Sequence, residues 1–144
     1  MTSTSPQANK PGGNYVPVVI HNGIAYVSGQ LPRRGEELLF SGKVGAEVDL
    51  ATAQQAAALC AVLCVTALAE AVGGIERIER LLRVTGYVAS AAGFNAQSQV
   101  MNGASDRFVE LLGEAGRHAR TSIGVAELPR GAPVEIDVIA AVRL

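Results

Sequence analysis

The last thirty residues of the chain, Gly113–Val142, are the part of the sequence that most narrowly limits the fold. Apolar residues alternate with small or polar residues over Ser122–Ala126 and again over Val134–Val138, which is the pattern of a β-strand with two unlike faces. The segment Pro-Arg-Gly-Ala-Pro, residues 129–133, separates the two runs and indicates a turn, because two prolines so close together do not fit inside a β-ladder. We therefore expect two strands joined by a turn.

The charged residues of these two strands indicate a ligand pocket. Arg120 opens the first strand, and Glu135 and Asp137 share one face of the second. If the strands pair as a hairpin centred near Arg130, Arg120 lies roughly 20 Å from Glu135 along the sheet. A pocket that uses both residues must then take one of them from a second subunit. The pattern predicts an oligomer with binding sites between its protomers.

The overall composition predicts one soluble domain without a disulfide framework. A chain of 144 residues can bury a core of its own. Residues 1–13 are rich in Ser, Thr, Pro, Gly and Asn and are expected to form a flexible N-terminal tail, which leaves residues 14–144 as a single domain. Cys60 and Cys64 are four apart in an expected helix, a spacing poorly suited to a disulfide, and we expect both to be small core residues. With no export signal in view, the expected compartment is the cytoplasm.

Leu50–Ala69 contains twenty residues without a charge, which meets the length criterion for a membrane span. Eight of these residues are alanine and only eight are Leu, Val or Cys, so the segment favours a tightly packed helix of a soluble protein. Asp49 is the expected N-cap, and Gly73 the expected end. The largely apolar circumference suggests that the helix is covered on more than one side, including by a second subunit.

The remaining segments complete an α+β fold. Alternation, helical spacing and turn residues predict four strands and a second helix, with Asn22-Gly23 as the turn of a hairpin. The expected strands are Tyr15–Ile20, Ile24–Ser28, a brief one at Leu38–Phe40, and Leu81–Ser90, and the expected second helix is Gln97–Leu112. The order β-β-(β)-α-β-α-β-β allows both helices to cover one face of a mixed sheet. The other face then needs a partner.

Local motifs for several kinds of chemistry are missing. The two histidines are far apart and the two cysteines lie in an apolar segment, so we expect no metal site. The glycine-rich pieces match neither a P-loop nor a dinucleotide fingerprint, so we expect no cofactor. Ser28 and Ser122 lack the surroundings of a hydrolase nucleophile. His118 could act as a general base near Arg120, although a loop histidine of no catalytic role is the commoner case. Arg120 could equally be an ordinary salt-bridging arginine.

Several pieces of the sequence together resemble one known family. They are Tyr15, VSGQLP at 27–32, Asn102, HARTSIGV at 118–125, LP at 128–129, and VEIDVIAAV at 134–142. With them the chain resembles the RidA/YjgF family, also called endoribonuclease L-PSP, from Asn14 to the C-terminus. GKVG at 42–45 and a lengthened segment at 94–102 resemble a longer branch of that family. The resemblance implies a chorismate-mutase-like fold and a homotrimer with pockets at subunit contacts.

The resemblance also implies an activity: hydrolysis of reactive enamines and imines, such as 2-aminoacrylate, to a 2-keto acid and ammonia without a cofactor. Arg120 is expected to bind the substrate carboxylate through its two-pronged guanidinium. Glu135 is expected to orient or deprotonate the attacking water. The expected substrate-binding residues are Tyr15, Ser28, Gly29, Asn102 and Ser122.

Two other functions remain open at this point. The same pocket could hold a small carboxylate metabolite, such as a keto acid, in a non-catalytic regulatory protein. The older family label suggests an endoribonuclease or translation inhibitor. A formal net charge of −1, no Trp, three Phe and three Tyr disfavour nucleic acid as a partner, because single-stranded RNA is usually bound by a basic surface with stacking aromatic residues.

Overall fold

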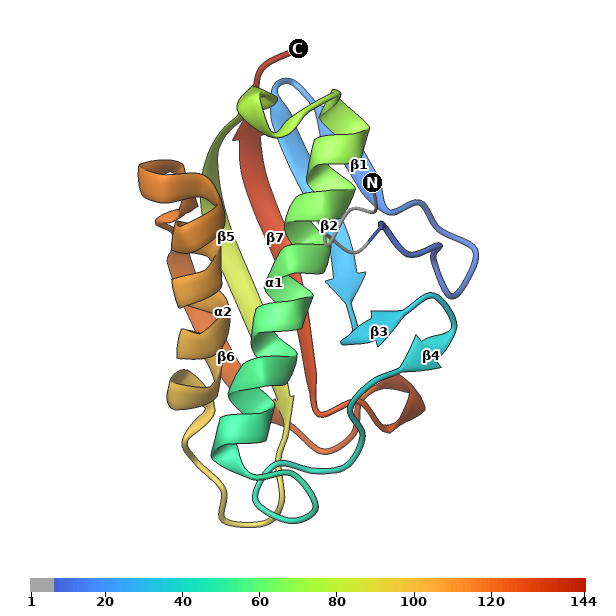
Figure 1. Ribbon diagram of the computed structural model, residues 1–144, viewed down its shortest axis with the longest axis vertical. Coiled ribbons are helices and arrows are strands. Elements are labelled where there is room, and N and C mark those ends of the chain that lie inside the picture. Colours follow the sequence, from blue (N-terminus) through green and yellow to red (C-terminus); the bar gives the residue numbers. More distant parts are fainter. Residues whose placement is uncertain (1–6) are drawn as a thin grey trace, which may run out of the picture.

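The computed structural model describes residues 7–144 and contains one five-stranded mixed sheet, a small two-stranded sheet and two long helices (Figure 1). In chain order the elements are β1 (Val18–His21), β2 (Ile24–Gln30), β3 (Arg33–Arg34), β4 (Glu37–Leu38), α1 (Leu50–Val72), η1 (Ile75–Arg77), β5 (Ile78–Ala89), α2 (Gln97–Leu112), η2 (Gly113–Gly116), β6 (Ala119–Val125), η3 (Pro129–Gly131) and β7 (Val134–Val142). The predicted α+β class is confirmed, and so is the predicted order of the long elements. The brief strand predicted at Leu38–Phe40 is wrong: only Leu38 belongs to a strand, and two short strands, β3 and β4, pair with each other here.

The large sheet has the strand order β1-β2-β7-β5-β6. Only the β5–β6 pair is parallel; the other pairs are antiparallel. Both α1 and α2 lie on one face of this sheet, as predicted (Figure 1). We call this the helix face, and the opposite one the open face.

The predicted pairing of the last two strands as a hairpin is wrong. β5 lies between them, so that Tyr87 is beside Ile123 of β6 on one side and beside Glu135 of β7 on the other. The reason is the crossover through α2, which returns the chain so that β6 runs parallel to β5 at the sheet edge. The predicted turn does occur at Pro129–Gly131, but it carries the chain past the end of β5.

The predicted first hairpin is confirmed. Val18 pairs with Val27 and His21 with Ile24. Asn22 has φ 52° and Gly23 has φ 76°, as a tight turn with two left-handed central residues requires. Asn and Gly tolerate this conformation, which explains why the Asn-Gly pair was a reliable signal.

Helix α1 begins and ends where the sequence indicates. The Asp49 side chain accepts a hydrogen bond from the Thr52 backbone N–H, and this bond lowers the pKa of Asp49. Gly73 ends the helix in a left-handed conformation, with φ 94°. By length and composition α1 could cross a membrane, but 56% of its most apolar window is buried inside the protein, as in a core helix. The sheet and α2 cover separate sides of α1, which accounts for its apolar circumference within one protomer.

The core lies between the helix face of the sheet and the two helices. Val134, Ile136 and Val138 of β7 point into it, which confirms the predicted alternation. Cys60 and Cys64 are buried beside them, and their thiols lie 3.9 and 3.6 Å from backbone carbonyl oxygens of β7. Burial raises the pKa of both thiols, so they are neutral core residues, as predicted.

The predicted N-terminal tail is only partly described, since residues 1–6 lie outside the described residues. Residues 7–13 run along the β3–β4 hairpin. Asn9 donates to the carbonyl oxygen of Arg33 at 3.0 Å and accepts from the N–H of Gly35 at 2.8 Å. The mobility of the tail stays a prediction, but its second half contributes to the surface near β2.

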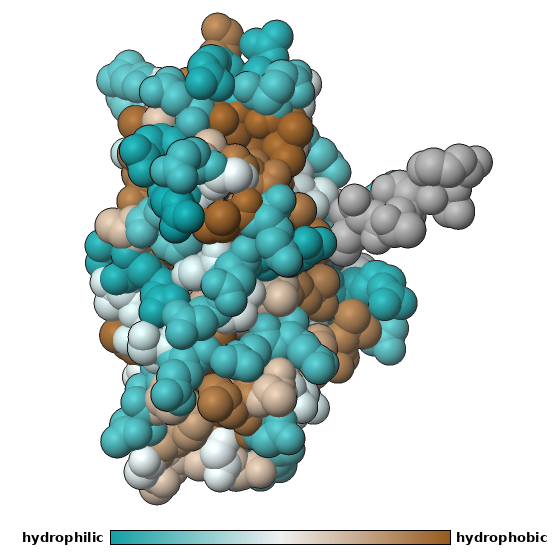
Figure 2. Space-filling view, turned by 60° about the vertical axis from the view of Figure 1, so that its left-hand side comes forward, coloured by the Kyte–Doolittle hydropathy of each residue, from teal (hydrophilic) through white to brown (hydrophobic). Residues whose placement is uncertain are grey.

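The open face of the sheet carries exposed apolar residues. Val19, Tyr26 and Ile123 retain 52%, 47% and 42% of their accessible surface. By contrast, the side of the molecule that Figure 2 brings forward is covered largely by hydrophilic residues, with hydrophobic residues in separate patches. Neither helix covers the open face, and its covering by a second subunit stays a prediction.

Candidate functional site

The structure divides the predicted site residues into two groups. Tyr15, Gly29 and Glu135 line one cavity. Arg120 and Asn102 are hydrogen-bonded to each other at a second place, at the edge of the sheet.

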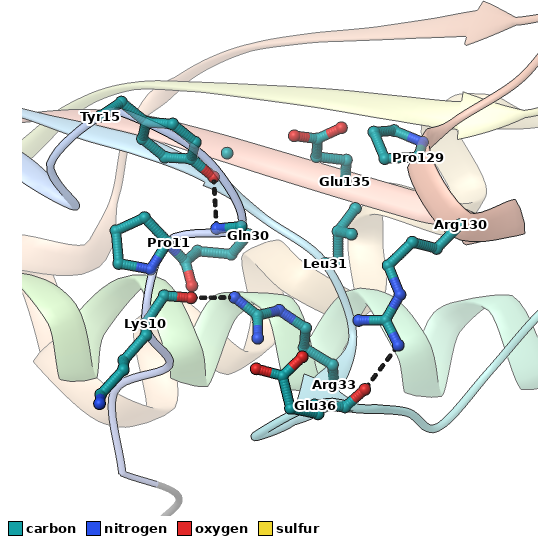
Figure 3. Close-up of a pocket in the computed structure, with 12 residues that line it drawn as sticks. Lys10, Pro11, Tyr15, Gln30, Leu31, Arg33, Glu36, Pro129, Arg130 and Glu135 are labelled. Carbon is teal, nitrogen blue, oxygen red and sulfur yellow. Dashed lines mark hydrogen bonds between the residues drawn. The ribbon is translucent and has the colours of Figure 1, made fainter.

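The cavity has a volume of about 400 Å³ and lies beside the end of β2 (Figure 3). Its lining comes from the N-terminal segment, from β2 and the residues after it, from the turn at η3, and from β7. The lining residues are Lys10, Pro11, Gly12, Tyr15, Gly29, Gln30, Leu31, Arg33, Glu36, Pro129, Arg130 and Glu135. Polar and apolar groups are mixed, and the volume exceeds what a three-carbon imine needs.

Glu135 is the acidic group best suited to proton transfer in this cavity. Its side chain is half-buried, and burial raises its pKa, with a further increase from the neighbouring charge of Asp137. The hydroxyl group of Tyr87 donates to the Asp137 carboxylate at 2.9 Å, and burial followed by this bond raises the pKa of Tyr87 to about 12. Tyr87 thus stays protonated and fixes Asp137, whose charge acts on Glu135.

Gly29 makes room for the Glu135 carboxyl group. A Cβ atom at residue 29 would lie 2.9 Å from Cδ of Glu135 and still closer to one carboxylate oxygen. We expect Gly29→Ala to displace the carboxylate and to lower any activity that depends on Glu135 about 10-fold, because reactions are sensitive to small displacements of a participating group. Stability should change little, since the group that must move is the end of a flexible side chain.

A double-mutant cycle tests this reading of Gly29. In the Glu135→Ala background the carboxylate is gone, so adding Gly29→Ala should lower activity no further. Equal losses in both backgrounds would show that residue 29 acts on something other than Glu135. Thermal unfolding of the four proteins at one concentration checks that the fold is kept.

The remaining predicted residue near the cavity, Ser28, has a different place. Its hydroxyl group donates to the carbonyl oxygen of Val16 at 2.8 Å and so ties β2 to the segment before β1. Ser28 is not among the lining residues. Tyr15 does line the cavity, and its hydroxyl group accepts from the N–H of Gly12 at 3.3 Å (Figure 3).

Three cationic residues of the cavity were missed by the sequence analysis: Lys10, Arg33 and Arg130. Arg33 donates to backbone carbonyl oxygens of Lys10 and Gly35, and Arg130 donates to that of Glu36 (Figure 3). These carbonyl acceptors carry no charge and so do not neutralise the two guanidinium groups. No local pattern marks these three residues, since only the folding of the N-terminal segment and the β3–β4 hairpin onto the end of β2 brings them together.

Arg120 lies on the helix face of β6, where α2 covers the sheet edge. One guanidinium nitrogen, Nη1, donates to Oδ1 of Asn102 and to Oγ of Ser105, each at 3.0 Å. The other, Nη2, donates to Oγ of Ser98 at 2.8 Å and lies 3.4 Å from the Ser98 carbonyl oxygen. Its partners are thus neutral, and within residues 7–144 no ion pair involves Arg120.

The partners of Arg120 form a polar stripe on α2. Ser98, Asn102 and Ser105 are spaced i, i+4 and i+7, which places them on one side of a helix. Sequence reasoning singled out Asn102 alone, although this spacing was a usable signal for all three. Ser105 also contacts His118, at 2.9 Å between Oγ and Nε2.

Ser122 is two residues beyond Arg120 on the same face of β6. Its hydroxyl oxygen is buried and has no hydrogen-bond partner among the described residues. A buried hydroxyl without a partner is uncommon in proteins. The hydroxyl therefore remains available to a group that enters between β6 and α2.

The structure does not bring Arg120 and Glu135 together within one protomer. Arg120 is beside Val84, which is beside Val138, three residues along β7 from Glu135. Arg120 points to the helix face, whereas Glu135 alternates with the buried residues of β7 and belongs to the open face. The predicted pairing of β6 with β7 is wrong, but the side chains of Arg120 and Glu135 are still far apart. They are separated by the thickness of the sheet and by β5.

The family was identified by comparison with known proteins. The family described as "Endoribonuclease L-PSP" matches residues 5–142, almost the whole chain. This chain belongs to the endoribonuclease L-PSP family. The predicted membership in RidA/YjgF is thereby confirmed.

Individual known proteins are also similar to this chain. Protein TCP17 of Trypanosoma cruzi is 40% identical over 135 residues, which are 93% of this chain and 84% of TCP17. The crystal structure of protein Atu1372 of Agrobacterium tumefaciens, of unknown function, has 44% identity and a TM-score of 0.89 and covers 94% of this chain and 87% of its own. A candidate endoribonuclease of Shewanella oneidensis has 28% identity, a TM-score of 0.92, and coverage of 96% and 91%.

Proposed function

We propose that this L-PSP family protein hydrolyses reactive enamines and imines that carry a carboxylate, such as 2-aminoacrylate, to 2-keto acids and ammonia. The observation that carries the proposal is the state of Arg120. Its guanidinium is fixed by neutral acceptors and has no carboxylate partner among the described residues, so its full charge is available to an anionic ligand.

In this proposal Arg120 binds the substrate carboxylate and thereby places the imine carbon. Once the enamine has tautomerised to the imine, water adds to that carbon. The resulting carbinolamine then breaks its C–N bond, and its hydroxyl proton passes to the departing nitrogen, so that ammonia and the ketone are released. Both steps need proton transfer, for which Glu135 is suited because its raised pKa brings it closer to neutral pH. The water proton passes to Glu135 and then to the leaving nitrogen, so the carboxylate is restored after each turnover.

We further propose that each site is completed by a second subunit in a homotrimer. Arg120 and Glu135 belong to opposite faces of one sheet, so one ligand can contact both only if they come from different protomers. The apolar residues Val19, Tyr26 and Ile123 on the open face supply a surface for such packing. Light scattering after size exclusion should give three times the 14.9 kDa mass of the chain; a stable monomer would contradict a shared site.

The first experiment measures keto-acid release from freshly generated 2-aminoacrylate with and without the protein. Because the substrate also hydrolyses in water, the protein must increase the initial rate in proportion to its concentration. Bovine serum albumin at equal concentration controls for nonspecific surface effects. If the rate stays at the background value for 2-aminoacrylate and for its four-carbon homologue, the deaminase proposal fails.

The role of Glu135 predicts the pH dependence of the reaction. The base must be ionised, so kcat/KM should fall on acidification through the Glu135 pKa, which lies above 4.5. Glu135→Gln should lower kcat/KM by about 10²-fold and remove this acid limb. Asp137→Asn is the matched variant: by removing the neighbouring charge it should keep the limb but move it to lower pH. An unchanged limb in Glu135→Gln would exclude Glu135 as the base.

A second candidate function is the endoribonuclease activity in the family's name. The observation that favours it is the group of Lys10, Arg33 and Arg130 around the cavity, since cationic residues bind phosphates. Incubation with single-stranded RNA, with Arg130→Ala as the control variant, tests it. A third candidate, a regulatory binder, predicts that a keto acid binds without any turnover of the imine.

A further inference from the structure

A chain of hydrogen bonds extends from Arg120 through Ser105 to His118 and ends at Gly116. The distances are 3.0 Å from Arg120 Nη1 to Ser105 Oγ, 2.9 Å from Ser105 Oγ to His118 Nε2, and 2.6 Å from His118 Nδ1 to the carbonyl oxygen of Gly116. We propose that Ser105 and His118 are positioning residues for Arg120 and hold its guanidinium in place only while the His118 imidazole is neutral. The proposal rests on the proposed role of Arg120 as the carboxylate-binding residue.

The carbonyl oxygen of Gly116, at the end of the chain of hydrogen bonds, determines which group donates in each bond. A backbone carbonyl oxygen can only accept, so Nδ1 of His118 must carry a hydrogen. In the neutral ring Nε2 is then an acceptor, and the Ser105 hydroxyl group donates to it. The lone pairs of Ser105 Oγ remain directed at Arg120, which donates through Nη1. Each of the three side chains is thereby satisfied in one arrangement.

Protonation of His118 disrupts this arrangement. Nε2 then carries a hydrogen and donates to Ser105 Oγ, so the hydroxyl hydrogen must find another acceptor. Two cationic groups, the imidazolium and Arg120, would now share one hydroxyl oxygen and repel each other. The hydrogen bond that Arg120 donates to Ser105 should therefore weaken, which frees the guanidinium to move.

The environment of His118 keeps the ring neutral at physiological pH. Burial lowers the pKa of His118, the hydrogen bond to Gly116 raises it, and the charge of Arg120 lowers it. From α2, Ser105 and the ring of Phe108 face the imidazole, the latter edge-on at 5.5 Å between centroids.

The other charged groups near this end of β6 are engaged elsewhere. Arg117 is paired with Glu114 at 2.9 Å, and Arg80 donates to the Arg117 carbonyl oxygen.

The consequence is a defined pH dependence of ligand binding. Carboxylate affinity should be complete above the His118 pKa and should fall as the pH drops through it. A simple electrostatic model predicts the opposite, since an added positive charge near Arg120 attracts an anion more strongly. Whether carboxylate affinity falls or rises on acidification therefore distinguishes a positioning role of His118 from a purely electrostatic attraction of the ligand.

The first test uses nitrogen-15 NMR of the imidazole and guanidinium groups in the full chain. The protein has two histidines, and a His21→Gln variant assigns the His118 signals. At neutral pH we expect the Nδ1–H tautomer of His118 and slow rotation of the Arg120 guanidinium. On acidification the Arg120 signals should become mobile together with the titration of His118. The Nε2–H tautomer at neutral pH, or an Arg120 unaffected by that titration, would overturn the proposal.

The second test compares variants by the affinity for 2-ketobutyrate, which stays ionised over the range used. Ser105→Ala should weaken binding roughly 10-fold at neutral pH and abolish the acid loss, because a hydrogen bond to a charged group is removed. Ser105→Thr keeps the hydroxyl group, so it should show the wild-type affinity at neutral pH and the wild-type loss of affinity on acidification. His118→Gln keeps a hydrogen-bond acceptor that does not titrate, so its affinity for 2-ketobutyrate should not fall on acidification. Thr66→Val removes a hydroxyl group that bonds only within α1 and should change nothing.

Failure of this inference and failure of the proposed function have different signatures. If the wild type does not release keto acid but the Arg120 guanidinium is ordered by Ser105 and His118, the deaminase proposal fails and the positioning role stands. If turnover is normal and Ser105→Ala leaves kcat, KM and the Arg120 signals unchanged, the positioning role is wrong and the deaminase proposal stands.

Discussion

Arg120→Ala should lower kcat/KM for 2-aminoacrylate by about 10²- to 10³-fold, because the loss of a charged partner from a hydrogen-bonded pair typically costs a few kcal/mol. The loss should appear in both kcat and KM, since the guanidinium binds the substrate and also orients the imine carbon toward the water. Initial rates of keto-acid release over a range of substrate concentrations measure the two parameters separately.

Two variants sharpen this expectation. Arg120→Lys keeps the charge, but a single ammonium group cannot replace the planar guanidinium in its bonds to Asn102, Ser105 and Ser98, so its activity should lie well below that of the wild type. Arg117→Ala removes a nearby exposed arginine that is paired with Glu114 and should keep full activity. Equal activity of Arg120→Ala and the wild type would remove Arg120 from the mechanism.

Gly103→Ala should destabilise the protein by about 2 kcal/mol and lower Tm by roughly 5–8 °C, although alanine is the better helix former. Gly103 lies in α2, where a Cβ atom would approach the backbone of Gln54 in α1, with 2.9 Å to its Cα and a still shorter distance to its carbonyl oxygen. Backbone cannot move aside as a side chain can, so the two helices must separate. The displacement should also disturb the polar stripe of α2 that holds Arg120.

Thermal unfolding at equal protein concentration measures the effect of Gly103→Ala. Asp106→Ala is the matched control, because it makes a similar gain in helix propensity at an exposed residue of the same helix. A higher Tm for Gly103→Ala than for the wild type would mean that α1 and α2 do not approach each other closely at this residue. In that case the higher helix propensity of alanine would account for the increase in Tm by itself.

Local signals in the sequence were strong wherever one residue type satisfies a backbone requirement. Asn22 and Gly23 gave the hairpin, because both tolerate a positive φ. Asp49 and Gly73 marked the ends of α1 through a side-chain cap and a left-handed residue. Alternation along β7 correctly separated its buried residues from the half-buried ones on the opposite face. These properties depend on neighbours in the chain and so can be read from it.

The main error of the sequence-based prediction was the pairing of β6 with β7, which depends on packing between segments distant in the chain. The Pro-rich segment at 129–133 does form a turn, but the same turn can join paired strands or pass over the end of a third. Which case occurs depends on where α2 returns the chain, and that is decided by packing between the helix and β5. A shared site was predicted from the wrong strand pairing, whereas in the structure the sheet itself separates Arg120 from Glu135, which supports the same proposal.

The sequence by itself determined the fold class, the order of the long elements, the two core cysteines and the family of this protein, because these follow from patterns along the chain and from specific motifs. It also singled out Arg120 and Glu135. Only the tertiary structure decided that these two residues occupy opposite faces of the sheet, that three residues of α2 surround Arg120, and that His118 reaches it through Ser105. Such contacts join segments whose proximity arises from long-range packing, for which a single sequence has no local signal.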